Sequence, residues 1–300
     1  MVDRLLELGW DVSVIDNFSS GKPERLNKHL NDPRFRLIRG DINDREALLG
    51  AMDGCTHVFH LAADPVIRGG FDDEAKRRSP TRNNVSGTQE VLEAMVRSGA
   101  ERILFASSST VYGEAKTVPT PEDYGPLKPI SIYGASKLAC EGFVTAYSHG
   151  FGLSYWIFRF ANIVGSRAVH GVVPDFISKL RDNPGELEIL GDGRQQKCYM
   201  HVEDCLDAML FCMKHSKNEI FNLGTDTPIS VVRVAHIVIE EMDLSDVEFR
   251  FTGGRRGWKG DLPLTYLDIC KLKALGYSPA MDSEEAVRRA ASEILAQGSW

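Results

Sequence analysis

Residues 102–113 read RILFASSSTVYG, a short apolar run that leads directly into a serine-rich turn. The run Arg102–Ala106 is almost continuously apolar, which is typical of a strand buried on both faces of a parallel sheet. Ligands of open α/β sheets bind beyond the carboxyl ends of the strands. The hydroxyl of Ser108, directly after this strand, is therefore well placed to hydrogen-bond a ligand. Taken alone, the serine-rich stretch is equally typical of an ordinary turn.

Strand patterns and helix patterns alternate on both sides of this run. The predicted strands are Asp11–Ile15, Phe35–Arg39, His57–Leu61, Arg102–Ala106 and Ser154–Phe160. The predicted helices between them are Pro23–Leu30, Arg45–Met52, Asn84–Ser98 and Tyr133–Ser148. This order predicts an α/β fold with a doubly wound parallel sheet. The pattern changes near residue 165, so we expect a first domain over residues 1–165 and a smaller, mixed α/β lobe over residues 166–300, with helices such as Val202–Lys214 and Val231–Met242.

Composition excludes several classes of protein. The 300 residues carry a net charge of −7, which argues against a nucleic-acid partner, and no apolar run is long enough to span a membrane. Asp3, Arg4 and Glu7 interrupt the first residues, so these are no signal peptide. The six cysteines form no CxxC pair. We therefore expect neither disulfides nor a metal site, and a reducing, cytoplasmic location.

Tyr133 and Lys137 form a YxxxK element, which places both side chains on one face of a helix. A tyrosine with a pKa near 10 is a poor base at neutral pH, but a neighbouring ammonium favours the phenolate. The pair therefore suits general acid–base chemistry. This spacing alone also occurs by chance in surface helices. Its position twenty-five residues after Ser108 makes the combination far more specific.

Several further elements occur along the chain in a fixed order. They are Asp16–Gly21, Gly40–Ile42, His60–Ala63, Asn84–Thr88, Ser107–Gly113, Tyr133–Lys137, Arg159–Asn162 and Tyr199–Asp204. Together these elements resemble the extended short-chain dehydrogenase/reductase family of NAD-dependent epimerases and dehydratases, and they are most similar to its UDP-glucose 4-epimerase branch. The resemblance implies a Rossmann-like fold, NAD as cofactor, a nucleotide-sugar substrate (a UDP-hexose) and a homodimer formed through paired helices.

The resemblance also implies roles for three residues. Tyr133 is expected to be the acid and base at the C4 hydroxyl of the sugar. Lys137 is expected to hold the nicotinamide ribose and tune Tyr133, and Ser108 to hydrogen-bond the same hydroxyl. The implied reaction is 4-epimerisation of the UDP-glucose/UDP-galactose type through a transient 4-keto sugar, with the nicotinamide carrying the redox chemistry.

The expected cofactor contacts come from four segments. Asp16 follows a predicted strand, where an acid accepts hydrogen bonds from the adenosine ribose and repels the 2′-phosphate of NADP. A lone Asp at such a place is more often a turn former. By resemblance, Asn17, Asp41 and Ile42 adjoin the adenosine, Leu61, Ala62 and Ala63 line the pyrophosphate and ribose, and Asn84 also binds the cofactor. Close packing is the alternative explanation for Ala62 and Ala63.

Substrate contacts are expected from the second half of the chain. Asn162 matches a family residue near the nucleotide phosphates, and Lys197 stands where many relatives carry an arginine. Arg255 and Arg256 offer planar groups suited to a diphosphate, although a solvated basic loop is the alternative. Thr265 corresponds to a position that lines the pocket around the sugar's C2 substituent. For Thr265 the alternatives are a solvent-exposed strand position, or Tyr266 as the pocket residue.

The chain departs from the family pattern at its start. Relatives open with a strand and a GxxGxxG turn that seats the pyrophosphate on a helix N-terminus. Met1–Gly9 resembles the end of the helix that follows this turn. Roughly twenty residues are therefore expected upstream in the gene's full product. We hypothesise a miscalled start codon or a truncation, and expect two inner strands of the sheet to be left without a partner.

Two other functions are compatible with much of this pattern. The sister dehydratases place acidic residues after the catalytic hydroxyl, whereas this chain has Ser109 and Thr110, so epimerisation is favoured over dehydration or decarboxylation. The second alternative is a non-catalytic dinucleotide-binding protein of the same fold. Ser108, Tyr133 and Lys137 together argue against it.

Overall fold

The computed structural model describes residues 1–65, 71 and 73–297, and the chain divides into two compact units. The first unit comprises Met1–Ser107, Ala135–Ile157 and Lys217–Glu219. The second comprises Ser108–Gly134, Phe158–Ser216 and Ile220–Trp300. Strand β4 and helix α5 pass from one unit into the other, so the units interleave along the sequence. The domain boundary near residue 165 stays a prediction.

The strands of the first unit lie in two sheets. β1 (Val12–Asp16) pairs in parallel with β2 (Phe35–Arg39), and β3 (His57–His60) pairs in parallel with β4 (Arg102–Ser108). The second sheet has the order β10-β5-β4-β3; its strands β5 (Ser154–Phe160) and β10 (Glu219–Leu223) pass into the second unit at Phe158 and Ile220. Each predicted strand is present within two residues of its expected bounds. Among the described residues, β1 and β3 belong to separate sheets.

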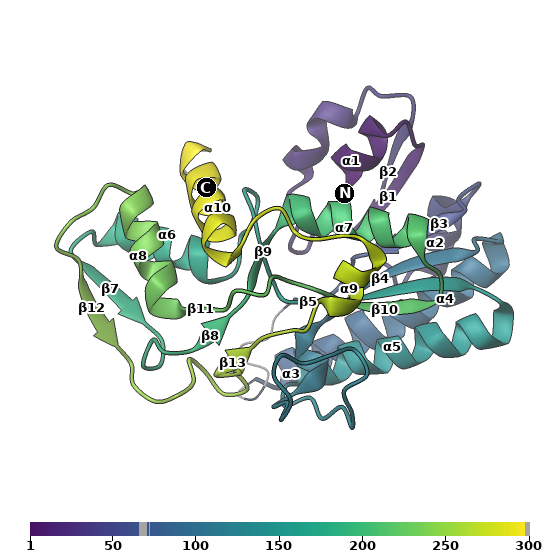
Figure 1. Cartoon of the computed structure of the whole chain (residues 1–300). Coiled ribbons are helices and arrows are strands. Elements are labelled where there is room, and N and C mark those ends of the chain that lie inside the picture. Colours follow the sequence, from purple (N-terminus) through teal and green to yellow (C-terminus); the bar gives the residue numbers. More distant parts are fainter. Residues whose placement is uncertain (66–70, 72, 298–300) are drawn as a thin grey trace. The chain divides into compact units, whose positions relative to one another are not determined.

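The helices of the first unit pack around these strands (Figure 1). They are α1 (Val2–Glu7), η1 (Pro23–His29), α2 (Arg45–Met52), α3 (Glu74–Pro80), η2 (Thr81–Ser86), α4 (Gly87–Ser98) and α5 (Ile132–Phe151). Two helix predictions were wrong in type or extent. Pro23–His29 is a 3-10 helix, and residues 84–86 belong to a π-helical turn that precedes α4. Gly87, the first residue of α4, lets Ile42 pack closely against the helix, because a Cβ there would lie 2.5 Å from Cδ1 of Ile42.

The second unit is a mixed α/β structure, as predicted for the later part of the chain. Its strands form the parallel pairs β6–β9 and β7–β12 and the three-stranded sheet β11-β8-β13. Their bounds are β6 Asn162–Val164, β7 Glu186–Ile189, β8 Gln196–Lys197, β9 Tyr199–His201, β11 Ile229–Ser230, β12 Glu248–Phe251 and β13 Leu264–Thr265. Its helices are η3 (Ser109–Tyr112), α6 (Val172–Asp182), α7 (Val202–His215), α8 (Val231–Glu241), α9 (Cys270–Leu275) and α10 (Ser283–Ala296).

Helices α6, α8 and α10 pack with β7 and β9 around one apolar core, which includes Phe176, Leu187 and Val238. Ion pairs such as Arg233–Glu284 join α8 to α10 at its surface. Cys198, Cys205 and Cys212 are buried free thiols. None of the helices in the described part of the chain is long and apolar enough to cross a membrane.

Candidate active site

Ser108 ends the buried strand β4 and caps the short helix η3. Its Oγ accepts hydrogen bonds from the backbone N–H of Thr110 (3.2 Å) and from the hydroxyl of Thr110 (2.9 Å). The turn closes at Gly113, where φ is +63° and a Cβ would lie 1.8 Å from the carbonyl oxygen of Lys128. Only glycine fits such a position. The predicted hydroxyl therefore lies at the carboxyl end of a strand, in a turn whose shape is closely constrained.

The start of α5 lies against this turn within the second unit. Ser131 Oγ accepts a hydrogen bond from the backbone N–H of Gly134 (3.0 Å), a helix-capping contact. A Cβ on Gly134 would lie 2.7 Å from the carbonyl oxygen of Thr110. The residue next to Gly134 is Tyr133, which is partly exposed. The fold thus brings together the two predicted elements, the serine turn and the YxxxK helix.

Lys137 follows one turn later on α5, in the first unit. It is only 3% exposed, and its Nζ donates a hydrogen bond to the carbonyl oxygen of Ala106 (2.8 Å). The ammonium lies 5.0 Å from the ring centroid of Phe105. Burial lowers the pKa of Lys137 to about 8, because desolvation disfavours the charged form. This lysine is therefore held close to its charge transition near neutral pH.

Asp16, Asn17 and Asp41 gather at the carboxyl ends of β1 and β2. Asp16 Oδ1 accepts a hydrogen bond from the backbone N–H of Phe18 (2.7 Å), and Asn17 Nδ2 donates to Asp41 Oδ2 (2.8 Å). Hydrogen bonds from the backbone and side chain of Asn43 lower the pKa of Asp41. The next residue, Ile42, packs against Gly87. These contacts hold an acidic, partly exposed corner in the first unit.

The segment after β3 holds the remaining predicted cofactor residues. Leu61 and Ala62 are exposed and Ala63 is partly exposed, so close packing does not explain Ala62. Asn84 is 1% exposed. Its Oδ1 accepts a hydrogen bond from the backbone N–H of Asp64 (2.7 Å), and its Nδ2 donates to Ser136 Oγ (3.0 Å). Asn84 therefore ties this segment to α5.

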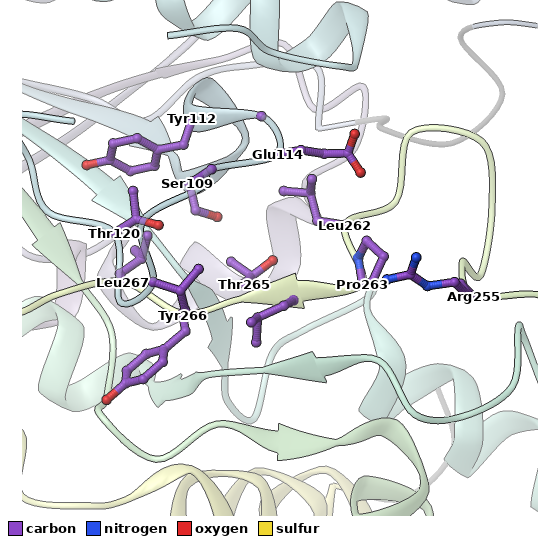
Figure 2. Close-up of a pocket in the computed structure, with 14 residues that line it drawn as sticks. Ser109, Tyr112, Glu114, Thr120, Arg255, Leu262, Pro263, Thr265, Tyr266 and Leu267 are labelled. Carbon is purple, nitrogen blue, oxygen red and sulfur yellow. The ribbon is translucent and has the colours of Figure 1, made fainter. Parts of the chain in front are cut away.

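A pocket of about 220 Å³ lies within the second unit (Figure 2). One wall is the turn after β4, and the other runs from Leu262 through β13 to Leu267. Thr265 lines the pocket and is 8% exposed, so it is not a solvent-exposed strand residue. Tyr266 also reaches the pocket, but its hydroxyl points away from the centre in Figure 2 and donates to the carbonyl oxygen of Asp226 (3.2 Å).

The predicted phosphate-binding cations lie in different surroundings. Arg255 lines the pocket and is exposed. Arg256 forms an ion pair with Glu114 and donates to the carbonyl oxygen of Asp261 (2.6 Å). Lys197 forms a largely buried ion pair with Asp261 (2.6 Å). The loop carrying the arginines is therefore anchored at Arg256, whereas Arg255 faces the cavity.

Asn162, another predicted substrate residue, begins β6. Its Nδ2 donates to the carbonyl oxygen of Cys198 (3.2 Å), which joins β6 to the segment between β8 and β9.

Sequence reasoning missed the fully buried Asn222 on β10, which joins the two walls of the pocket. It accepts a hydrogen bond from the hydroxyl of Tyr112 (2.7 Å) and donates to the carbonyl oxygens of Thr120 and Asp268 (both 2.9 Å). Arg159 donates to the same Tyr112 hydroxyl (2.9 Å). Asparagine within an otherwise apolar strand is the signal that marks such a position. Its partners are too far away in sequence to be inferred.

A family model described as the NAD dependent epimerase/dehydratase family matches residues 1–224. The chain belongs to this family. A putative UDP-glucose 4-epimerase of Methanocaldococcus jannaschii is 32% identical over 96% of this chain and 92% of its own length. The solved UDP-glucose 4-epimerase of Thermotoga maritima, with UDP-glucose, is 31% identical, covers 99% of this chain and 95% of its own, and superposes with a TM-score of 0.88. UDP-glucuronic acid decarboxylase 1 of Arabidopsis thaliana is 31% identical over 98% of this chain and 66% of its own length.

The family uses NAD, and part of this chain has the groups that NAD binding requires. The acidic corner at the ends of β1 and β2 fits the adenosine half, since Asp16 and Asp41 offer acceptors for ribose hydroxyls. Gly254, Gly257 and Gly260 have the GxxGxxG spacing, but they lie between β12 and β13. The element that follows them is a strand, so this loop lacks the helix N-terminus that binds pyrophosphate. Residues Val2–Glu7 form helix α1, in agreement with the predicted helix end at Met1–Gly9.

Proposed function

We propose that this protein is an NAD-dependent nucleotide-sugar 4-epimerase that interconverts UDP-glucose and UDP-galactose. The observation that carries the proposal is the packing of the Tyr133 segment of α5 against the turn that bears Ser108, beside a pocket lined by Ser109 and Thr265. The names of the relatives support a UDP-sugar substrate. Residues that follow the catalytic hydroxyl in this chain, Ser109 and Thr110, have no acidic group for dehydration.

In this proposal each side chain has one task. Tyr133 takes the proton from the sugar's C4 hydroxyl and later returns it. Ser108 hydrogen-bonds the same oxygen and orients it. Lys137, held at Ala106, supplies a positive charge that favours the tyrosinate. NAD, when bound, supplies reversible hydride acceptance at the sugar's C4 carbon. The pocket beside the serine turn would give the sugar room to present either face of its C4 carbon.

The remaining polar residues bind the two ligands in this proposal. Asp16, Asn17 and Asp41 hold the adenosine of NAD, with Ile42, Leu61, Ala62, Ala63 and Asn84 in supporting positions. Arg255 and Lys197 bind the diphosphate of the sugar nucleotide, with Arg256 and Asn162 beside them. Thr265 adjoins the sugar's C2 substituent.

We also propose a homodimer that forms through the exposed helix faces of the first unit. Val96 on α4 is 37% exposed and Phe151 on α5 is 58% exposed. These exposed apolar side chains support a surface that a second copy of the chain covers. Light scattering of the purified protein tests this, since a monomer at micromolar concentration would contradict it.

The deciding experiment offers the purified protein UDP-glucose with NAD and follows UDP-galactose by chromatography. Parallel reactions contain UDP-glucuronic acid, with release of CO₂ measured, and dTDP-glucose, with formation of the 4-keto-6-deoxy sugar measured. Epimerisation of UDP-glucose is expected. Turnover only in a parallel reaction would replace the proposal with the matching sister activity. Binding of NAD without turnover of any substrate would favour a non-catalytic role.

A further inference from the structure

The proposed reaction leaves one buried acidic group of the first unit without a task. Glu141 lies on α5 one turn after Lys137 and is 4% exposed. Ser107 Oγ donates a hydrogen bond to its Oε1 (2.5 Å). Burying a carboxylate is costly unless it is hydrogen-bonded or balanced by a nearby charge. A carboxylate held at this position therefore calls for an explanation.

Glu141 and Lys137 both form hydrogen bonds with residues near the carboxyl end of β4. Lys137 Nζ donates to the carbonyl oxygen of Ala106 (2.8 Å), and Glu141 accepts from the side chain of Ser107. Two side chains from successive turns of α5 thus bind two successive residues of β4. The residue that follows in the chain is Ser108. This double contact sets the position of the helix along the strand.

Among the described groups of the first unit, Cys140 and Glu141 act to raise the pKa of Lys137 against the effect of burial. His60 on β3 is buried, which lowers its pKa to about 3, so it is neutral at pH 7. Burial raises the pKa of the Cys140 thiol on α5, so this group is neutral too. On β4, Phe105 presents its ring and Ala106 a carbonyl oxygen. Burial lowers the pKa of Lys137, and the charge of Glu141 acts in the opposite direction.

We propose that Glu141 is a positioning residue for Lys137: anchored on Ser107, its carboxylate keeps the buried ammonium charged and fixed against the end of β4. The hydrogen bond between Ser107 and Glu141 does not depend on the reaction. Its consequence for catalysis rests on the proposed function, in which Lys137 must carry a positive charge beside Tyr133.

The test is a titration of the Lys137 ammonium in the whole protein without substrate. Lysine labelled with ¹³C at Cε is incorporated, and the Lys137 signal is identified by its loss in Lys137→Arg. In Glu141→Gln the midpoint of this signal should fall by about one pH unit, because removing an opposite charge at short range disfavours the ammonium. An unchanged or raised midpoint would overturn the proposal.

The chain offers a matched control. Glu93 also binds α5, through the hydroxyl of Tyr147 (2.5 Å), but at a point ten residues beyond Lys137. That separation is about 15 Å along the helix. Glu93→Gln should leave the Lys137 midpoint where it is, and an equal fall in both variants would show a general loss of charge rather than a specific contact. Should Glu141→Gln not fold, Glu141→Asp replaces it: the shorter side chain withdraws the carboxylate and should lower the midpoint by less. No fall in that variant would also overturn the proposal.

Catalysis gives a separate measurement. Activity that needs charged Lys137 falls as pH rises through its pKa, so the alkaline limb of the kcat profile should move to lower pH in Glu141→Gln. KM for the sugar nucleotide should stay nearly constant. If the protein has no epimerase activity, the NMR titration still decides the role of Glu141. An altered titration with an unmoved pH–rate profile would overturn the catalytic part of the proposal.

Discussion

Two tyrosines close to the serine turn differ in their burial and in their hydrogen bonds. Tyr112 and Tyr133 both belong to the second unit, near the serine turn. Burial raises the pKa of Tyr112 to about 12, and its hydroxyl is held by Asn222 and Arg159. Tyr112 therefore stays protonated at neutral pH. Tyr133 at the start of α5 is partly exposed, and the proposed function assigns proton transfer to this tyrosine.

Replacing Tyr133 with Phe should lower turnover by about 10²- to 10⁴-fold, because a positioned acid–base group contributes that much. The cofactor should stay bound, since the change removes one oxygen. Initial rates and the amount of NAD that copurifies with the variant are the measurements. Near-normal turnover would remove Tyr133 from the proposed mechanism.

Thr265 should decide whether N-acetylated sugars are accepted. The protein is expected to epimerise UDP-N-acetylglucosamine as well as UDP-glucose, because threonine leaves room in the pocket. Thr265→Tyr should lower kcat/KM for the N-acetylated substrate about tenfold or more relative to UDP-glucose. Thr265→Val, of similar size without the hydroxyl, separates bulk from hydrogen bonding. Equal losses on both sugars in Thr265→Tyr would show that Thr265 does not limit the size of the substrate.

Asp16 should impose the preference for NAD. Its carboxylate at the end of β1 repels a 2′-phosphate, so Asp16→Ala should bring the dissociation constant for NADP closer to that for NAD. Titration calorimetry with both dinucleotides measures this. If the unmodified protein binds NAD and NADP equally well, Asp16 does not contact the adenosine ribose.

Among the secondary-structure elements, α5 carries most of the proposed chemistry. Its first turn is set by the Ser131 contact and by the close approach of Gly134 to Thr110. Its second and third turns present Lys137 and Glu141 to the end of β4. Small changes in the position of this helix would therefore alter several groups at once.

Gly134→Ala and Gly142→Ala form a matched pair on this helix. A Cβ on Gly134 would meet the carbonyl oxygen of Thr110 at 2.7 Å, whereas a Cβ on Gly142 has no atom within 4 Å. Gly134→Ala should lower both the urea midpoint of unfolding and turnover. Gly142→Ala should raise the free energy of unfolding by about 0.5–1 kcal/mol, because alanine restricts the unfolded chain. If the two variants had similar urea midpoints and turnover, the close approach of Gly134 to the carbonyl oxygen of Thr110 would be refuted.

The stability of the whole molecule should depend on pH through buried histidine. Burial lowers the pKa of His60 from 6.5 to about 3 in the folded protein and also lowers that of His57. Between these values the unfolded chain binds the proton and the folded chain does not, so stability falls as pH falls below 6.5. The slope for one such group approaches about 1.4 kcal/mol per pH unit.

Urea unfolding between pH 7 and pH 5 checks this dependence. His60→Gln should flatten the curve, and His57, whose pKa burial also lowers, should contribute to the slope that remains. A slope as steep in the variant as in the unmodified protein would exclude His60 as its source.

Local patterns were enough to predict the strands and most helices; they also indicated the Ser108, Tyr133 and Lys137 elements, whose roles stay a proposal. Apolar runs, turn residues and the YxxxK spacing act over a few residues, and such short-range preferences are visible in the sequence. The strand–helix order likewise predicted the α/β class. Local patterns did not predict the 3-10 form of residues 23–29 or the π-helical turn before α4.

Only the tertiary structure showed how distant residues meet. Glu141 lies beside Ser107, Asn222 joins Thr120 to Asp268, and Thr265 lines the same pocket as Ser109. These contacts join segments between 34 and 156 residues apart, since Glu141 follows Ser107 by 34 positions and Thr265 follows Ser109 by 156. A sequence pattern specifies which groups are polar or apolar. Whether a buried polar group finds its partner depends on the packing of whole elements, which no local pattern contains.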